Sequence, residues 1–192
     1  MGTDYIIRLA GPEHLDQLPA IERAAATRFG DSLPQSVLSH VTPADTLEAA
    51  QSAGLLWVAL DPAGTPVGFA VASVHGRRVH LEELDVLPEH GRRGVGSALV
   101  RAVADFALGS GCAEVTLTTF RDIPWNAPFY ERAGFEVIPE RELDEALLRR
   151  LSDETELGLD RSRRVAMRKP LRPDPLPHRE SRRNSQYGGD SS

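Results

Sequence analysis

A short run of glycines and arginines, placed between a predicted strand and an amphipathic helix, constrains this chain more than any other feature. The run is Gly91-Arg92-Arg93-Gly94-Val95-Gly96-Ser97, and it follows the predicted strand Val79–Leu87. Backbone amides in such a turn face outward with no Cβ to block a ligand, and the dipole of the following helix adds positive potential. The segment therefore predicts a strand, an anion-binding turn and a helix, with Arg92 and Arg93 supplying charge at the rim.

Two well-known phosphate-binding loops do not match this run. A dinucleotide fingerprint needs a third glycine, but the spacing from Gly94 and Gly96 places Leu99 at that position. A nucleoside-triphosphate loop needs a lysine before its hydroxyl residue, whereas Ser97 directly follows Gly96. The turn therefore belongs to a different class of anion site, one suited to a pyrophosphate.

The rest of the chain alternates strand and helix signals. Apolar and β-branched runs predict strands at Tyr5–Ala10, Leu55–Leu60, Val67–Val74, Val79–Leu87, Val115–Thr119, Phe135–Ile138 and Arg163–Arg168. Apolar spacings and helix-ending glycines predict helices at Pro12–Ala25, at Pro43–Ala53, between Gly96 and Gly109 and at Trp125–Arg132, with a charged helical stretch at Arg141–Leu151. The order β-α-α-β-β-β-α-β-α-β-β predicts one α/β (α+β) domain with a mixed, mostly antiparallel central sheet flanked by helices.

Charge is distributed unevenly along the 192 residues, whose net charge is −6. Residues 1–160 hold 13 arginines against 25 acidic residues, a net charge of −12, whereas residues 161–192 hold 9 basic against 3 acidic residues, a net charge of +6. An acidic body disfavours nucleic acid as a partner, because phosphates need a basic surface. Residues 170–192 are rich in Pro, Arg, Ser and Gly, so we expect a folded domain over residues 1–169 and a disordered tail.

The residue inventory excludes several classes of site. Cys112 is the only cysteine, which excludes an intramolecular disulfide and multi-cysteine metal centres. Lys169 is the only lysine, which disfavours Schiff-base catalysis, and the histidines show no metal-ligand spacing, so no metal is expected. No apolar run approaches the length of a membrane span. We therefore expect a protein of the cytoplasm with no membrane partner.

A second element lies about thirty residues after the glycine-rich turn and reads Asn126-Ala127-Pro128-Phe129-Tyr130-Glu131-Arg132-Ala133-Gly134-Phe135. With both elements in place, residues 4–169 resemble the GCN5-related N-acetyltransferase superfamily, which binds acetyl-CoA at a [Gln/Arg]-x-x-Gly-x-[Gly/Ala] loop. One departure is that Gly91 stands at the family's Gln or Arg position. The resemblance implies the acyl-CoA N-acyltransferase fold, acetyl-CoA as co-substrate and an amine-bearing acceptor.

The same resemblance implies which residues contact acetyl-CoA. The candidates are Leu84, Val86, Arg92, Arg93, Gly94, Val95, Gly96, Ser97, Asn126 and Tyr130. The backbone amides of residues 92–97 would hold the diphosphate, the amide of Val86 would stabilise the oxyanion, and Asn126 would hold pantetheine or an ordered water.

Direct transfer to an amine benefits from a base, because an alkylammonium with a pKa near 10.4 is neutral only about once in 10^3.4 at pH 7. Strand alternation predicts that one face carries His80, Glu82 and Leu84 and that the other carries Leu81, Glu83 and Asp85. By resemblance the base lies on this strand. We expect Glu82 to serve, directly or through water, with His80 assisting, and Glu83 to replace it if a bulge shifts the pleat.

Tyr130 is the candidate acid for the leaving thiolate, by the same resemblance. Each role has a structural alternative: either carboxylate is a solvated strand residue or pairs with an arginine, and Tyr130 packs as a core aromatic beside Phe129 and Phe135. For the whole chain, the second hypothesis is a CoA-binding regulatory or interaction module without catalysis. The identity of the acceptor and the formation of a homodimer both stay open.

Overall fold

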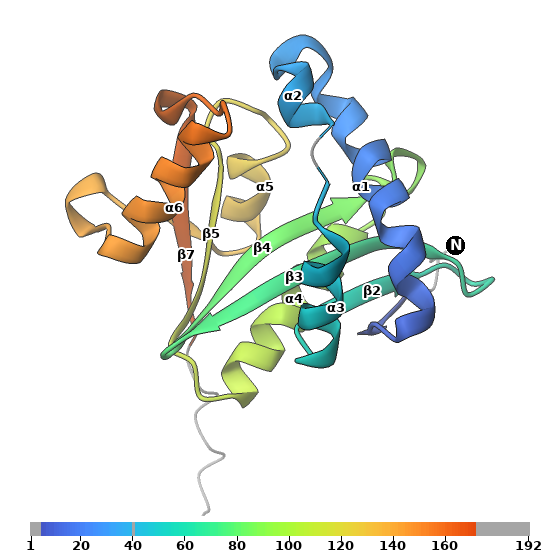
Figure 1. Cartoon of the computed structure of the whole chain (residues 1–192). Helices are drawn as coiled ribbons and strands as arrows, with labels where there is room; N and C mark the ends of the chain where they lie inside the picture. The colour runs from blue at the N-terminus through green and yellow to red at the C-terminus, as the bar shows by residue number, and fades with distance from the viewer. Residues whose placement is uncertain (1–4, 40, 172–192) are drawn as a thin grey trace, which may run out of the picture.

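The computed structural model describes residues 5–39 and 41–171, which form one seven-stranded sheet with helices on both faces (Figure 1). The strands lie in the order β1-β2-β3-β4-β5-β7-β6. Their bounds are β1 Ile6–Leu9, β2 Leu56–Leu60, β3 Pro66–His75, β4 Arg78–Val86, β5 Glu114–Phe120, β6 Glu136–Val137 and β7 Arg164–Pro170. Among these neighbours only β4 and β5 are parallel, which confirms the mixed, mostly antiparallel sheet.

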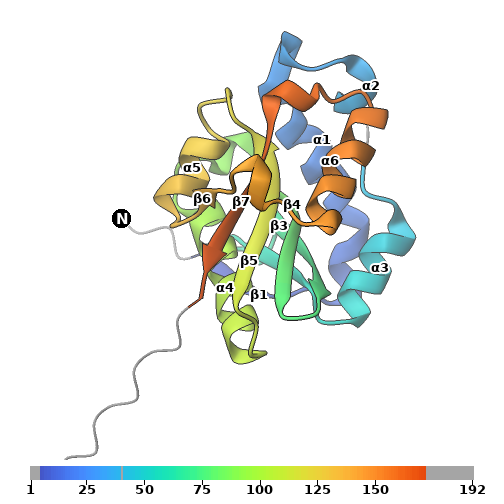
Figure 2. The same ribbon diagram turned by 90° about the vertical axis from the view of Figure 1, so that its left-hand side faces the viewer.

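Helices cover the sheet in two layers (Figure 2). The α-helices are α1 Leu18–Ala26, α2 Gln35–Leu38, α3 Ala44–Ser52, α4 Val95–Gly109, α5 Ala127–Arg132 and α6 Glu145–Glu156. One face of the sheet packs against α4 and α5, where Leu99 and Val103 of α4 are buried. The other face packs against α1 and α3 beside β2 and β3, and against α6 beside β7. Burying a leucine or valine side chain in this way contributes about 1.5–3 kcal/mol to stability.

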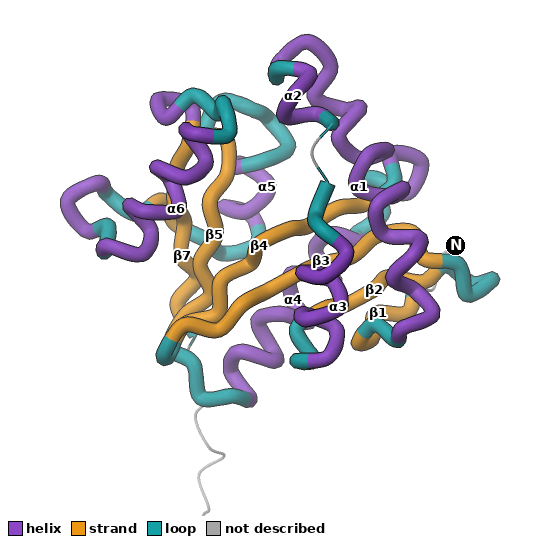
Figure 3. Tube along the Cα trace, viewed as in Figure 1, coloured by secondary structure: helices purple, strands orange, loops and turns teal. Residues whose placement is uncertain are grey.

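The two parallel strands separate after a short paired segment (Figure 3). Pairing joins Arg78 to Glu114, Val79 to Val115 and His80 to Thr116, and no further pair follows. Both strands continue beyond this point, β4 to Val86 and β5 to Phe120. The second half of β4 therefore has a strand partner, β3, on one side alone.

A β-bulge at Glu82 changes which residues of β4 share a face. Val71 of β3 lies opposite Glu83 and the next residue, Ala72, lies opposite Leu81, so Glu82 is an extra residue in the ladder. Val79 and Leu81 pack into the core beneath α4 before the bulge, whereas Leu84 and Val86 do so after it. The predicted alternation of His80, Glu82, Leu84 against Leu81, Glu83, Asp85 is therefore wrong, because the extra residue inverts the pattern.

Three helical segments also differ from the sequence prediction. The helix expected over Pro12–Ala25 is a 3₁₀ helix at Pro12–Gln17 followed by α1, since Pro19 occupies the first turn of α1. The expected element order omits α2 and the charged helix, which is α6 and begins four residues later than expected. Asp144 sets that start, because its carboxylate accepts the Leu147 amide as an N-cap.

The remaining strands and helices lie where the sequence placed them, within a few residues. The expected tail falls on residues 170–192, of which residues 172–192 lie outside the described part of the chain. In the described ranges, no helix combines the length and apolar character needed to cross a membrane.

Candidate active site

The glycine-rich turn leads from β4 into α4 through two residues in the left-handed region. Arg92 has a φ of +57° and Gly94, which precedes the first residue of α4, has a φ of +85°. A residue with a Cβ at position 94 would be strained at this φ, which explains the glycine there. The first amide to bond back into the helix belongs to Ala98, which donates to the Gly94 carbonyl at 2.9 Å.

Six consecutive amides therefore remain available at the start of α4. Within residues 5–39 and 41–171, no acceptor pairs with the backbone N–H groups of residues 92–97. Arg92 and Arg93 are exposed, and neither side chain forms an ion pair with a described residue. Unpaired amides, a helix N-terminus and two free guanidinium groups together fit the diphosphate of a CoA ester.

The turn packs directly against α5, the helix that Asn126 caps and that carries Tyr130. A Cβ on Gly96 would lie 3.4 Å from the ring of Phe129 and 3.9 Å from the Val86 side chain. Asn126 caps α5 with its carbonyl, which accepts the amides of Phe129 and Tyr130. The fold thus brings together the two sequence elements that carried the family resemblance.

The free side of β4 presents backbone groups next to this turn. The Leu87 amide donates to the Val67 carbonyl of β3 at 2.9 Å. Because successive amides of a strand point in opposite directions, the Val86 amide points away from β3, toward the side where β5 has separated.

Glu82, the expected base, takes part in an ion-pair cluster with α6. Arg150 donates to both carboxylate oxygens of Glu82, and Ser73 adds a short hydrogen bond. Burial alone would raise the pKa of Glu82, but the hydrogen bonds from Arg150 and Ser73 outweigh it and hold the pKa below its ordinary value. Glu82 is therefore an ionised partner of Arg150 at neutral pH.

His80 lies at the point where β4 and β5 separate. Its Nδ1 is 2.9 Å from the hydroxyl of Thr116, and the residue is buried. Burial lowers the pKa of His80 to about 4, and the positive charge of Arg150 acts in the same direction. The imidazole is thus neutral at physiological pH and joins the two strands.

Glu83 and Asp85, on the other side of the bulge, form an acidic cluster with Glu22 of α1. One carboxylate oxygen from each lies within 4.8 Å of the other two. Burial and the charge of Glu22 raise the pKa of Glu83 to about 7, and burial and the charge of Glu83 raise the pKa of Asp85 well above its ordinary value. Part of this cluster therefore holds protons at neutral pH.

Tyr130 lies close enough to this cluster to be affected by its charge. Burial raises the pKa of the Tyr130 phenol, and the charges of Glu83 and Asp85 raise it further. Its ring packs edge-on against Phe129 and Phe135, at centroid distances of 4.9 and 5.6 Å. Because its pKa is raised, the phenol stays protonated at neutral pH. Among the described residues its hydroxyl has no hydrogen-bond partner, so the O–H group is available as a donor.

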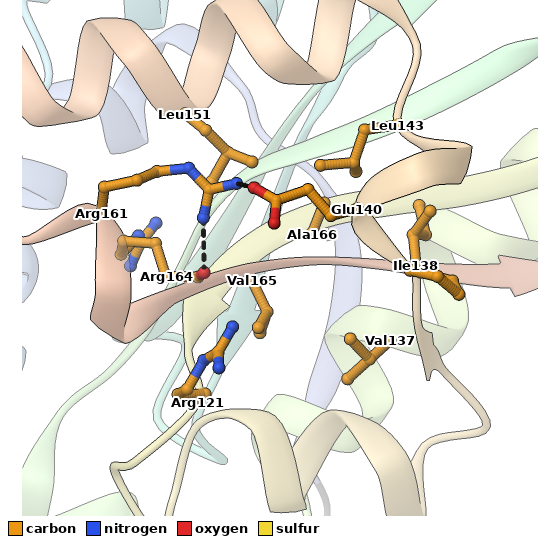
Figure 4. Close-up of a pocket in the computed structure, with 11 residues that line it drawn as sticks. Arg121, Val137, Ile138, Glu140, Leu143, Leu151, Arg161, Arg164, Val165 and Ala166 are labelled. Carbon is orange, nitrogen blue, oxygen red and sulfur yellow. Dashed lines mark hydrogen bonds and ion pairs between the residues drawn. The ribbon is translucent and has the colours of Figure 1, made fainter.

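The positive charge of Arg164 on β7 lowers the pKa of both Glu83 and Tyr130, against the upward shift that burial causes. Glu154 of α6 binds its guanidinium through two hydrogen bonds of 2.8 Å. Arg164 also lines a cavity of about 210 Å³ between α6 and the β6–β7 edge (Figure 4). That cavity contains none of the residues predicted from the sequence.

The structure therefore divides the predicted catalytic residues into two groups. His80 and Glu82 lie with Arg150, whereas Glu83 and Tyr130 lie near each other with Asp85. Sequence reasoning did not single out Glu22. The available signal was its place four residues after Leu18, on the buried face of α1, where a carboxylate is unusual.

Comparison with known proteins agrees with this fold. The acetyltransferase (GNAT) family model matches residues 20–135, which include the whole sheet from β2 to β5, the glycine-rich turn and α5. The chain therefore belongs to the acetyltransferase (GNAT) family.

Two curated relatives and one solved structure illustrate the similarity. Thialysine N-epsilon-acetyltransferase from Bos taurus is 31% identical over 77 residues, which are 38% of this chain and 44% of that protein. Streptothricin acetyltransferase from Streptomyces lavendulae is 32% identical over 120 residues, 60% of each chain. The PaiA N-acetyltransferase of Thermoplasma acidophilum, solved with coenzyme A, superposes with a TM-score of 0.66 at 17% identity, covering 88% of this chain and 99% of that one. The first of these matches spans less than half of the curated relative.

Proposed function

We propose that this protein is an N-acetyltransferase that moves the acetyl group of acetyl-CoA directly to a primary amine. The observation that carries the proposal is the row of unpaired amides at residues 92–97, placed beside a separated β4 edge that also carries Glu83. Family membership supports it, as do relatives whose names are those of N-acetyltransferases. The named acceptors, thialysine and streptothricin, suggest an aliphatic amine for this chain too.

In this proposal the turn binds the diphosphate through the amides of residues 92–97, with Arg92 and Arg93 compensating its charge. The pantetheine arm follows the free edge of β4 past Val86 and Leu84, and Asn126 holds the arm or an ordered water. The Val86 amide, which points away from β3, donates to the oxyanion of the tetrahedral intermediate.

Glu83 is the base in this proposal, and Glu82 is not. Moving a proton from an alkylammonium of pKa about 10.4 to a carboxylate of pKa about 7 is uphill by roughly 4.6 kcal/mol. The same transfer to Glu82, whose pKa lies below 4.5, costs at least about 8 kcal/mol. Since catalytic bases work best near the operating pH, the difference favours Glu83. His80 then serves as a neutral support between β4 and β5.

The transfer step balances with these groups. The acceptor nitrogen gives one proton to Glu83, and its lone pair forms the bond to the thioester carbon. The C–S bond breaks with its electron pair on sulfur, and the second nitrogen proton neutralises the thiolate, so the products are an amide, a thiol and one proton released through Glu83. Tyr130, whose raised pKa makes complete proton transfer to a thiolate of pKa about 8.5 unfavourable, donates a hydrogen bond to the leaving sulfur.

The proposal assigns this activity to the domain expected over residues 1–169 and to the cytoplasm. The antiparallel pairing of β7 with β5 runs from Arg164 to Pro170, so the paired strand reaches one residue past that boundary.

The test is thiol release from acetyl-CoA by the full chain, with L-lysine, thialysine, n-butylamine and streptothricin as acceptors and calorimetry of CoA binding in parallel. We expect binding of acetyl-CoA and amine-dependent thiol release, with the acetylated amine identified by mass spectrometry. Tight CoA binding without turnover on any amine would contradict the proposal and support the binding-module hypothesis. No CoA binding would contradict both.

A further inference from the structure

The cavity between α6 and the β6–β7 edge lies apart from the residues proposed for acetyl transfer. It has a volume of about 210 Å³ and contains none of those residues (Figure 4). In the strand order β4-β5-β7-β6, both β5 and β7 lie between this edge and the opening between β4 and β5. One water molecule needs roughly 10–15 Å³ of such space, so the cavity admits a molecule of several non-hydrogen atoms.

The wall of this cavity is largely apolar. Most of it belongs to the small core that α6 forms with β7 and with the segment after β6. The apolar side chains that line it include Ile138, Leu143, Leu151, Val165 and Ala166. Val137 of β6 extends the same surface outward, where 43% of the residue is exposed. The cavity therefore offers a hydrocarbon-binding surface that is open to a ligand from outside.

The charged groups of the lining are three arginines and one glutamate, namely Arg121, Arg161, Arg164 and Glu140. Glu154 of α6 neutralises Arg164 through two hydrogen bonds of 2.8 Å, and Glu140 accepts from Arg161 at 2.9 Å. From the described part of the chain, no hydrogen bond or ion pair reaches the guanidinium of Arg121. The lining therefore keeps one positive charge without a partner.

Arg161 has donors to spare beside that unpaired charge. Its guanidinium donates to the Arg164 carbonyl at 3.2 Å and to Glu140, so only two of its five N–H groups are used. The Glu140 side chain is 80% exposed, and a pair this open to solvent is weak. Arg121 and Arg161 reach the same stretch of β7 from opposite sides (Figure 4). Because both line one small cavity, one ligand can contact both guanidinium groups.

We infer that this cavity binds a small aliphatic carboxylate as a further ligand of the protein, separate from acetyl-CoA and from the acceptor amine. Arg121 and Arg161 hold the carboxylate, since guanidinium groups pair with carboxylates through strong charge-assisted hydrogen bonds. The hydrocarbon part lies against Ile138, Leu143 and Leu151. An inorganic anion would leave this apolar wall uncovered, and a neutral molecule would leave Arg121 without a partner.

The probe is isovalerate, a branched aliphatic carboxylate, titrated into the full chain at pH 7 and followed by calorimetry. Coenzyme A is present, so that the free amides of residues 92–97 do not serve as a second anion site. We expect isovalerate to bind with a Kd on the order of 1 mM. Acetate keeps the charge without most of the hydrocarbon, and 3-methyl-1-butanol keeps the hydrocarbon without the charge. Each should bind at least about tenfold more weakly.

Arg121→Gln and Arg161→Gln should each weaken isovalerate binding about tenfold, because each removes a charged donor to the carboxylate. Arg121 is exposed and unpaired among the described residues, so its variant should fold even if Arg161→Gln does not. The matched control is Arg149→Gln, which removes the same charge from an exposed position of α6 outside the cavity. Its Kd for isovalerate should change by less than about twofold.

Amide NMR spectra of the same titration locate the ligand. We expect the largest shifts at Val137, Ile138 and Leu143, which line the cavity, and none at residues 92–97. Four results would overturn the inference: no isovalerate binding up to about 20 mM, equal affinity for isovalerate and either comparison ligand, shifts confined to the glycine-rich turn, or an unchanged Kd in Arg121→Gln. Acetyl transfer to amines is measured separately, so its absence would contradict the proposed function alone.

Discussion

Glu82 and Glu83 are neighbours on β4, yet the fold gives the two carboxylates opposite surroundings. Glu82 meets a guanidinium and a hydroxyl, which hold its pKa below the ordinary value. Glu83 meets Glu22 and Asp85 in a buried setting, which raises its pKa to about 7. The bulge at Glu82 separates the two. The position of each carboxylate relative to one extra backbone residue therefore decides which of the two can accept a proton at neutral pH.

The largest expected effect separates the two carboxylates by activity. Glu83→Gln removes the proposed base while keeping the side-chain volume, so kcat should fall at least about 100-fold, or roughly 2.7 kcal/mol in the barrier. Glu82→Gln should lower kcat by less than about threefold, because the Glu82 carboxylate is ion-paired with Arg150 and is not the proposed base. Steady-state kinetics with n-butylamine and acetyl-CoA check both. A larger loss in Glu82→Gln would reverse the assignment and return the role to Glu82.

The second effect separates the two carboxylates by stability. Between pH 4.5 and about 7, folded Glu83 holds a proton that the unfolded chain has lost, so its contribution to stability falls as the pH rises through this window. Glu83→Gln removes that penalty. We expect the variant to gain on the order of 2 kcal/mol over wild type at pH 8 and little at pH 4.5, measured by urea unfolding. Equal differences at both pH values would show that Glu83 is not perturbed.

The turn and the strands were predictable from sequence because their signals are local. Gly94 needs a positive φ, and the helix that follows it is amphipathic, so a few adjacent residues determine the structure. The sequence also predicted that Tyr130 belongs with this turn, and the contact between Gly96 and Phe129 of the same helix brings them together. Both the mixed sheet and the family follow from these elements.

The acidic cluster was not predictable in the same way. A bulge depends on how β3 and β4 pair, and the sequence near Glu82 contains neither a glycine nor a proline that would mark it. Glu22 and Asp85 are 63 positions apart in the sequence, so their meeting depends on the packing of α1 on the sheet. The partner of Glu82 was also not predictable, because Arg150 is 68 positions away in the sequence, on a helix inserted between β6 and β7.

A third effect concerns the hydroxyl group beside each carboxylate. Tyr130→Phe removes the phenol near Glu83, and we expect kcat to fall about tenfold, since one hydrogen bond to the leaving sulfur is lost. Binding of acetyl-CoA should change by less than twofold. The matched control is Ser73→Ala, which removes the hydroxyl bound to Glu82 and should change kcat by less than twofold. If Tyr130→Phe weakens CoA binding as much as it lowers kcat, the tyrosine serves packing instead.

The smallest effect tests the surroundings of Glu82 alone. Arg150→Ala removes the guanidinium that joins α6 to β4, and the two side chains of this pair are 28% and 30% exposed. We expect a loss of about 1 kcal/mol at pH 7, since partly exposed pairs are screened by solvent. The loss should shrink as the pH falls below about 4.5, because a carboxylate with a lowered folded pKa stabilises the protein above its unfolded pKa and ceases to do so when protonated.

Arg149→Ala is the matched control for that variant. Arg149 lies next to Arg150 on α6 and pairs with Glu145 at 2.9 Å, but the two side chains are 66% and 89% exposed. Its removal should cost less than about 0.5 kcal/mol at any pH, measured by the same urea unfolding. Equal losses of stability in the two variants would mean that the ion pair of Arg150 with Glu82 adds no stability. The lowered pKa of Glu82 would then need a different cause, and Ser73 is the remaining hydrogen-bond donor to its carboxylate.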